Sequence, residues 1–233
     1  MVKEPTPTNP FSAFSLIELL AVVAIVGVLA TLLVPVTQKV IGNARGSKCL
    51  SNLRQLGVGW HAYATDHDGR LPSVGWKNAG NNPDNPGIRD YVGLPSVLGS
   101  DPWRRATVFT CPELQANPST RTEEALFRTY SVNQLAADVY SGIPPAGLKK
   151  KLTAIQRPSQ FAVAMDGICD LSRPANDRYS TMVRNFGGTP LDQIQRPHAG
   201  KTAVLFADGH TAHADSVTIL DTSPNSVFWR DPG

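Results

Sequence analysis

The sequence predicts an α+β fold in which one long amino-terminal helix packs on a small antiparallel sheet connected by long loops. An almost unbroken apolar run extends from Phe14 to Pro35. Apolar residues then continue at helical spacing to about Asp66. The rest of the chain contains many of its 19 Gly and 19 Pro residues and only short apolar pieces, a pattern typical of short strands and loops.

The apolar run is long enough to cross a membrane. About 20 residues at a rise of roughly 1.5 Å span the hydrocarbon layer as a helix, whereas soluble core helices rarely stay apolar on every face. We therefore predict that residues 14–36 are the membrane-spanning part of the helix and residues 37–68 its extramembrane continuation. Pro35 is expected to kink this helix.

Glu18 is the one acid inside the apolar run. An ionisable group at membrane depth is costly and is a functional candidate. Alternatively, Glu18 caps the helix start, where the helix dipole favours an anion. The composition of the run leaves both interpretations open.

The residues around Glu18 resemble a known processing site. The segment Ala13-Phe14-Ser15-Leu16-Ile17-Glu18-Leu19-Leu20 is similar to that of type IV prepilins and of the pseudopilins of type II secretion, and Pro35 stands where these proteins usually carry a kinking proline. The resemblance implies a pilin-like fold and a cytoplasmic leader, residues 1–13. It also implies that a prepilin peptidase cleaves between Ala13 and Phe14 and methylates the new amino terminus at Phe14. Ala13 departs from the family pattern, which nearly always has Gly there.

Cleavage would give Glu18 a partner. The freed amine of Phe14 would lie four residues before Glu18, on the same helix face. A carboxylate in a low dielectric needs a cation, which the amine of the same or a neighbouring subunit would supply. Such a pair would set the stagger between subunits, so we predict that Glu18 is an assembly residue.

Beyond the membrane, the helix carries an apolar stripe at three- and four-residue steps. Arg45, Asn52, Arg54 and Gln55 fall between the stripe residues. We expect Trp60 and His61 to belong to this core-packing part of the helix rather than to bind a cofactor. The helix should end near Asp66, because Gly69 suits a left-handed cap and Pro72 cannot continue a helix. The predicted stripe consists of Cys49, Leu50, Leu53, Leu56, Trp60 and Tyr63.

The globular head is predicted to cover residues 69–233. Residues 74–102 are rich in Gly, Asn and Pro and are expected to form a long surface loop. Short apolar pieces follow at 107–111, 130–132 and 161–165, with possible helical turns at 123–127 and 148–155. Residues 201–217 predict a hairpin closed by Asp208-Gly209. Nine residues separate His198 from Asp208-Gly209, which resembles a carboxyl-terminal signature of many prepilin-like proteins.

The three cysteines are Cys49, Cys111 and Cys169. Outside the cytoplasm, one disulfide and one remaining thiol are plausible. All three pairings, or three unpaired core residues, remain open from the sequence. The resemblance implies Cys49 with Cys111, because family members often carry a Cys on the helix and a later Cys-Pro, here Cys111-Pro112.

Metal binding and catalysis have weaker patterns. A transition metal would need His198, Asp208, His210 and His213 together, but His210 and His213 face opposite sides of a strand. Calcium is conceivable because major pseudopilins often hold one in a carboxyl-terminal loop. Cys169 and His198 come without a nucleophile signature, so we predict no enzyme and no cofactor. The oxygen donors that calcium would use are Asp166, Asp170, Asp208 and Asp215.

Two functions follow from these expectations. The first is a structural subunit that joins a filament of a secretion or type IV pilus-like system, with the peptidase, other pilin-like subunits and the inner membrane as partners. The second is an anchored periplasmic or surface module that binds a polysaccharide or protein. The net charge of +3 is scattered, so no nucleic-acid partner is expected. Lys39, Arg45 and Lys48 follow the span, which favours a cytoplasmic head, whereas the motif favours a periplasmic or surface-exposed head; we follow the motif.

Overall fold

The computed structural model describes residues 15–72, 87–94, 107–116, 129–133, 136, 151–167, 182–183, 194, 196–221 and 226–229. The chain divides into two compact units, Met1–Ile41 and Gly42–Gly233. The leader, residues 1–13, and the predicted cleavage and methylation site at Ala13 and Phe14 lie outside the described residues. So do Cys169, Asp170 and the possible helical turn at residues 123–127.

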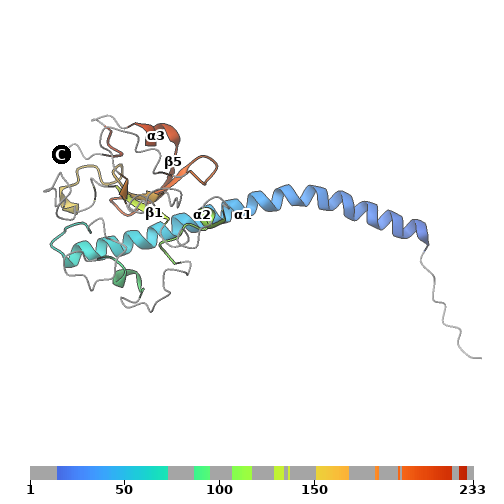
Figure 1. Cartoon of the computed structure of the whole chain (residues 1–233), viewed down its shortest axis with the longest axis horizontal. Helices are drawn as coiled ribbons and strands as arrows, with labels where there is room; N and C mark the ends of the chain where they lie inside the picture. The colour runs from blue at the N-terminus through green and yellow to red at the C-terminus, as the bar shows by residue number, and fades with distance from the viewer. Residues whose placement is uncertain are drawn as a thin grey trace, which may run out of the picture. The chain divides into compact units, whose positions relative to one another are not determined.

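One helix, α1 (Leu16–Asp66), runs through both units as a continuous ribbon (Figure 1). In the first unit, its large apolar side chains are between 49% and 79% exposed. This part of α1 is long and apolar enough to cross a membrane, as the sequence predicted. The helix continues through Pro35, and a kink at that residue stays a prediction.

The second unit contains a five-stranded sheet with the order β3-β1-β2-β4-β5. The pairs β1·β2, β2·β4 and β4·β5 are antiparallel, as predicted. The edge strand β3 is parallel to β1, so the sheet is mixed rather than wholly antiparallel. The strands are β1 (Tyr130–Asn133), β2 (Ala162–Asp166), β3 (Met182–Val183), β4 (Thr202–Phe206) and β5 (Thr211–Ala214).

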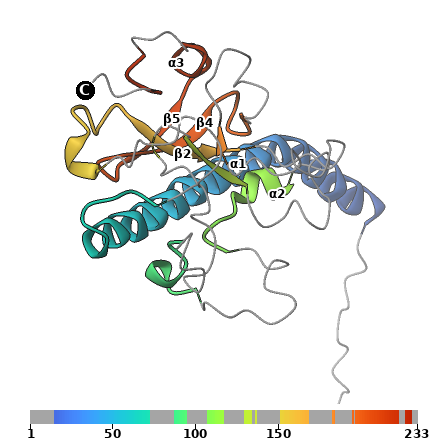
Figure 2. The same ribbon diagram turned by 60° about the vertical axis from the view of Figure 1, so that its left-hand side comes forward.

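Each face of the sheet is covered (Figure 2). The second half of α1 packs on one face, where Ala203 and Leu205 of β4 join its core. Val204 points the other way, because neighbouring residues of a strand face opposite sides. It packs with α3 (Ser216–Leu220) and with residues 226–229. The result is a helix on a sheet, the predicted α+β architecture.

The predicted apolar stripe of α1 is its buried face. Cys49, Leu53 and Leu56 are fully buried and Trp60 is 2% exposed, so Trp60 is a core residue as expected. Asn52 was expected on the polar face and is buried instead. Its Nδ2 donates a hydrogen bond to the carbonyl oxygen of Thr110 at 2.8 Å, which satisfies the amide inside the protein.

The helix ends as the sequence predicted. The N–H of Gly69 donates to the carbonyl of Ala64 at 2.7 Å, and Gly69 has a φ of 76°, the conformation of a glycine cap. Within the predicted surface loop at 74–102, residues 87–94 are described and contain the short helix η1 (Asp90–Val92). Ile88 is fully buried there, so this part of the loop contributes to the core.

Two other segments form turns, and a helical turn was predicted within the second of them. Residues 107–110 make a turn that leads into α2 (Pro112–Ala116). The segment at 148–155 contains a single turn, η5 (Leu152–Ala154), within its described part.

The carboxyl-terminal hairpin is present but shorter than predicted. Asp208 and Gly209 lie in the turn between β4 and β5, and Gly209 has a φ of 88°, where a glycine is favoured. The returning strand ends at Ala214 rather than at Val217. Asp215 stops it, because its Oδ1 accepts the N–H of Thr218 at 2.9 Å and caps α3.

Candidate functional site

The start of α1 holds the candidate assembly residue. Oε2 of Glu18 accepts the backbone N–H of Ser15 at 3.0 Å. Ser15-Leu16-Ile17-Glu18 thus forms part of a capping box, in which the acid at the third helical position satisfies the N–H of the cap residue. In the chain that still carries its leader, Glu18 therefore caps the helix. Pairing with the Phe14 amine concerns the cleaved chain and stays a prediction.

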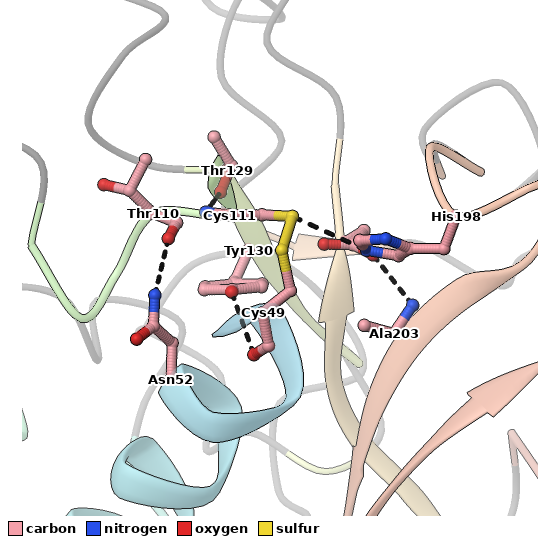
Figure 3. A network of polar contacts seen from close by, with 9 residues as sticks. Cys49, Asn52, Thr110, Cys111, Thr129, Tyr130, His198 and Ala203 are labelled. Atoms are coloured by element: carbon pink, nitrogen blue, oxygen red, sulfur yellow. Dashed lines mark hydrogen bonds and ion pairs between the residues drawn. A yellow bond between two sulfur atoms is a disulfide. The ribbon is translucent and has the colours of Figure 1, made fainter. Parts of the chain in front are cut away.

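A second candidate site lies in the head, between α1 and the sheet. We call it the His198 centre, and it consists of His198, Asp166, His213 and the disulfide between Cys49 and Cys111. Figure 3 shows the imidazole of His198 beside this disulfide. His198 is buried and forms an isolated bridge with Lys201 just before β4. The turn between them places Ala199 and Gly200 at φ angles of 52° and 82°. This tight turn brings the imidazole beneath α1.

Asp166 connects β2 to this imidazole. It is fully buried at the end of β2, and its Oδ2 accepts the N–H of Ala203 at 2.7 Å. The same oxygen lies 3.1 Å from Nε2 of His198. Burial raises the pKa of Asp166, although the contacts with His198 and Ala203 oppose this shift. A buried carboxyl group is thus held by partners from two other segments.

The disulfide forms the other wall of the centre. Cys49 of α1 is bonded to Cys111, the residue before α2, which is the pairing expected. Sγ of Cys111 lies 3.5 Å from Nε2 of His198. The hydroxyl of Tyr130 donates to the carbonyl of Cys49 at 3.2 Å, and burial raises the pKa of Tyr130 well above its ordinary value. The disulfide thus anchors α1 beside the first strand of the sheet.

Strand β4 accounts for the nine-residue spacing of the carboxyl-terminal signature. His198 lies before this strand and Asp208-Gly209 after it, and both ends contact α1. A Cβ placed on Gly46 would lie 3.3 Å from Nδ1 of His198. One on Gly57 would lie 3.5 Å from the carbonyl oxygen of Gly209. The nine intervening residues therefore connect two contact points on the same helix.

Asp208 and His210 form a separate pair at the hairpin turn. Oδ1 of Asp208 accepts the backbone N–H of His210 at 3.0 Å and also contacts its Nδ1. Burial opposes the charged form of Asp208, but the bonds from His210 prevail and lower its pKa. The ring of His210 stacks on Phe206 at 4.3 Å. His213 instead faces His198, so the two histidines point to opposite sides, as predicted.

The structure divides the candidate metal ligands among separate places. His198 faces His213, whereas Asp208 pairs with His210, so the four do not form one site. Of the calcium candidates, Asp166 bonds to His198 and Ala203, Asp208 to His210, and Asp215 to Thr218. Within the described ranges, the one group of three metal-type ligands is Cys49, Cys111 and His198, with ligand atoms within 4.8 Å. Its sulfurs are joined in the disulfide.

The role of Asp166 as the partner of His198 was not predicted from the sequence. Asp166 was predicted only as an oxygen donor for calcium, although its place directly after the apolar residues 161–165 is a sign of a buried carboxylate. Nothing in the sequence indicates which of several histidines would face that acid, because the pairing depends on the tight turn at residues 198–201.

Comparison with known proteins identifies a single motif. The model of the prokaryotic N-terminal methylation motif matches residues 9–34. No curated protein and no solved structure matches the chain. The prepilin-type motif is therefore present, and it implies processing by a prepilin peptidase. Together with the exposed apolar half of α1, it suggests a membrane-anchored, exported protein.

Proposed function

We propose that this protein is a structural, non-catalytic pilin-like subunit. A prepilin peptidase cleaves it between Ala13 and Phe14 and methylates Phe14. The mature chain then assembles through its amino-terminal helix, with other pilin-like subunits, into a filament of a secretion or type IV pilus-like system. The observation that carries this proposal is the methylation motif at residues 9–34, which continues into a helix whose second half packs by one face on a pilin-like head.

The apolar half of α1 supports assembly because it remains uncovered. Leu16, Leu20 and Leu32 are between 63% and 79% exposed, and exposed apolar patches of this extent mark membrane or protein contacts. In the membrane they contact lipid. In a filament the same side chains pack on neighbouring subunits.

The disulfide supports a head outside the cytoplasm. Stable disulfides form in oxidising compartments and are rare in the cytosol. The basic residues after the span favour the opposite orientation, but the disulfide and the methylation motif both favour an exported head. We therefore place the head in the periplasm or at the cell surface.

The His198 centre supports a structural role for the head. Its carboxyl group, imidazole and disulfide are buried and contact one another. A catalytic group must reach a substrate, whereas these groups join α1 to β2 and β4. The centre fixes the head on the helix that carries it into the filament.

Two substitutions of Glu18 test the assembly role. Glu18→Gln keeps an acceptor oxygen for the Ser15 N–H, since Gln also completes a capping box, but it removes the charge. Glu18→Ala removes both. We expect both variants to be processed and both to fail in filament assembly, measured by electron microscopy and by cross-linking in cells. Filaments formed by Glu18→Gln would show that Glu18 acts only as a helix cap. A wild-type chain that forms no filaments and binds a polysaccharide would favour the binding module.

A further inference from the structure

We propose that His198 and His213 form a binding site for a divalent transition-metal cation of the copper or zinc class, beside Gly46 of α1. The site uses ring nitrogens that the protein leaves without partners. Nδ1 of His198 and Nε2 of His213 are both buried from solvent, and neither has a hydrogen-bond partner among the residues that the structure describes. A buried nitrogen without a partner is costly, so two in one place call for a ligand.

The two nitrogens face the same small volume. A Cβ built on Gly46 would lie 3.3 Å from Nδ1 of His198 and 3.9 Å from Nε2 of His213. Gly46 has no side chain, so α1 approaches both rings closely at this point. The imidazole of His198 is enclosed, with its side chain 4% exposed. The buried His198 ring therefore has its unpaired Nδ1 on the side of the His213 imidazole.

The separation of the two rings suits a shared cation. Zinc binds imidazole nitrogen at about 2.0–2.1 Å, which puts each ring centre about 3.1 Å from the metal. At ligand angles of about 90–109°, two bound rings have centres roughly 4.4–5.2 Å apart. The centres of His198 and His213 are 4.8 Å apart. The separation of the ring centres therefore matches that of two imidazoles bound to one cation.

Asp166 supplies the support that a metal-binding histidine usually has. Metal-bound imidazoles almost always donate their other N–H to a carboxylate or carbonyl. Nε2 of His198 lies 3.1 Å from Oδ2 of Asp166, which assigns the proton to Nε2 and leaves a lone pair on Nδ1. The arrangement of carboxylate, imidazole and open nitrogen is thus complete before any metal arrives.

His213 contributes a neutral ligand. Burial and the neighbouring His198 lower its pKa, against the opposing effect of Asp166, and a metal binds the neutral form of imidazole. His213 is half-buried on β5, so its ring is the more exposed of the two.

Copper(II) binding to the full-length protein in detergent, prepared without a histidine tag, tests the proposal. Copper forms the tightest complexes among the divalent first-row metals, and its electron paramagnetic resonance spectrum counts the bound nitrogens. We expect one copper per chain with two imidazole nitrogens. His213→Ala should abolish this two-nitrogen signal. Asp166→Asn should weaken binding about 10- to 100-fold, the usual effect of removing such a support.

Two further variants separate this site from the rest of the molecule. His210→Ala removes a histidine from the same hairpin that stacks on Phe206 and should leave the copper signal unchanged. Gly46→Ala keeps both ligands and places a methyl group in the shared volume, so it should weaken copper binding. Near-ultraviolet circular dichroism checks that each variant is folded, and Gly46→Ala decides the matter if His213→Ala does not fold.

Four results would overturn the proposal. If the wild-type protein binds no copper, the two ring nitrogens share only a bridging water and not a metal. A two-nitrogen signal that persists in His213→Ala, or one lost in His210→Ala, would place the copper elsewhere. Binding that is unchanged in folded Gly46→Ala would mean that the volume beside α1 is not the site.

Discussion

The disulfide between Cys49 and Cys111 should account for a large part of the stability of the head. The double substitution Cys49→Ala/Cys111→Ala removes the bond without leaving a thiol that can pair with Cys169. The bond joins residues 62 positions apart. A loop of that length loses about 4 kcal/mol of chain entropy in the unfolded state when it is closed. We therefore expect the free energy of unfolding to fall by about 4 kcal/mol.

Thermal unfolding of the full-length protein in detergent measures this effect. For a domain of 150–250 residues, 1 kcal/mol shifts the midpoint by roughly 2–4 °C, so the double variant should unfold about 8–16 °C below wild type. Trp60 and Trp229 are buried, and their fluorescence reports the transition. Cys169→Ala is the matched control because it removes a cysteine and keeps the disulfide, so its midpoint should stay well above that of the double variant. A double variant within about 2 °C of wild type, or peptide mapping that finds Cys169 in the bond, would refute the reasoning.

The remaining predictions concern two glycines of α1 and one histidine. Gly59→Ala should lower the free energy of unfolding by about 1–3 kcal/mol, because its Cβ would lie 2.5 Å from Cγ1 of Val92. A Cβ on Gly42 would have no atom within 4 Å, so Gly42→Ala should raise the free energy of unfolding by roughly 0.5–1 kcal/mol. Urea titration of the two variants measures both changes. Equal effects would contradict the close packing at Gly59. The lowered pKa of His213 means that the unfolded chain binds more protons below about pH 6.5. The protein should therefore lose stability as the pH falls below that value, and His213→Gln should lose less. If wild type and His213→Gln show the same dependence of stability on pH, His213 does not cause the loss.

The helix and its buried face could be predicted because they depend on local patterns. Spacing of Leu53, Leu56 and Trp60 gives one face of a helix, and Gly69 marks its end. The turn at Asp208-Gly209 is equally local. Each of these features is encoded within about a dozen neighbouring residues, so the sequence was sufficient to predict them.

Contacts between distant segments were harder to predict. Asn52 lies between apolar residues of the stripe, but it is buried because the carbonyl of Thr110, 58 residues away, accepts its hydrogen bond. Ile88 is fully buried although its segment is rich in loop-forming residues. The partner of His198 is Asp166 at the end of β2, whereas His198 lies just before β4. Such contacts depend on how distant segments pack together, which local propensity does not encode.

Mass spectrometry of the mature amino terminus tests the proposed function most directly. The protein would be isolated from cells that contain the prepilin peptidase and, as a control, from cells that lack it. We predict a chain that begins with N-methylated Phe14 only where the peptidase is present, and the unprocessed chain beginning at Met1 in the control. A chain that keeps Met1 in the presence of the peptidase, or one cleaved after the apolar run, would contradict the proposal.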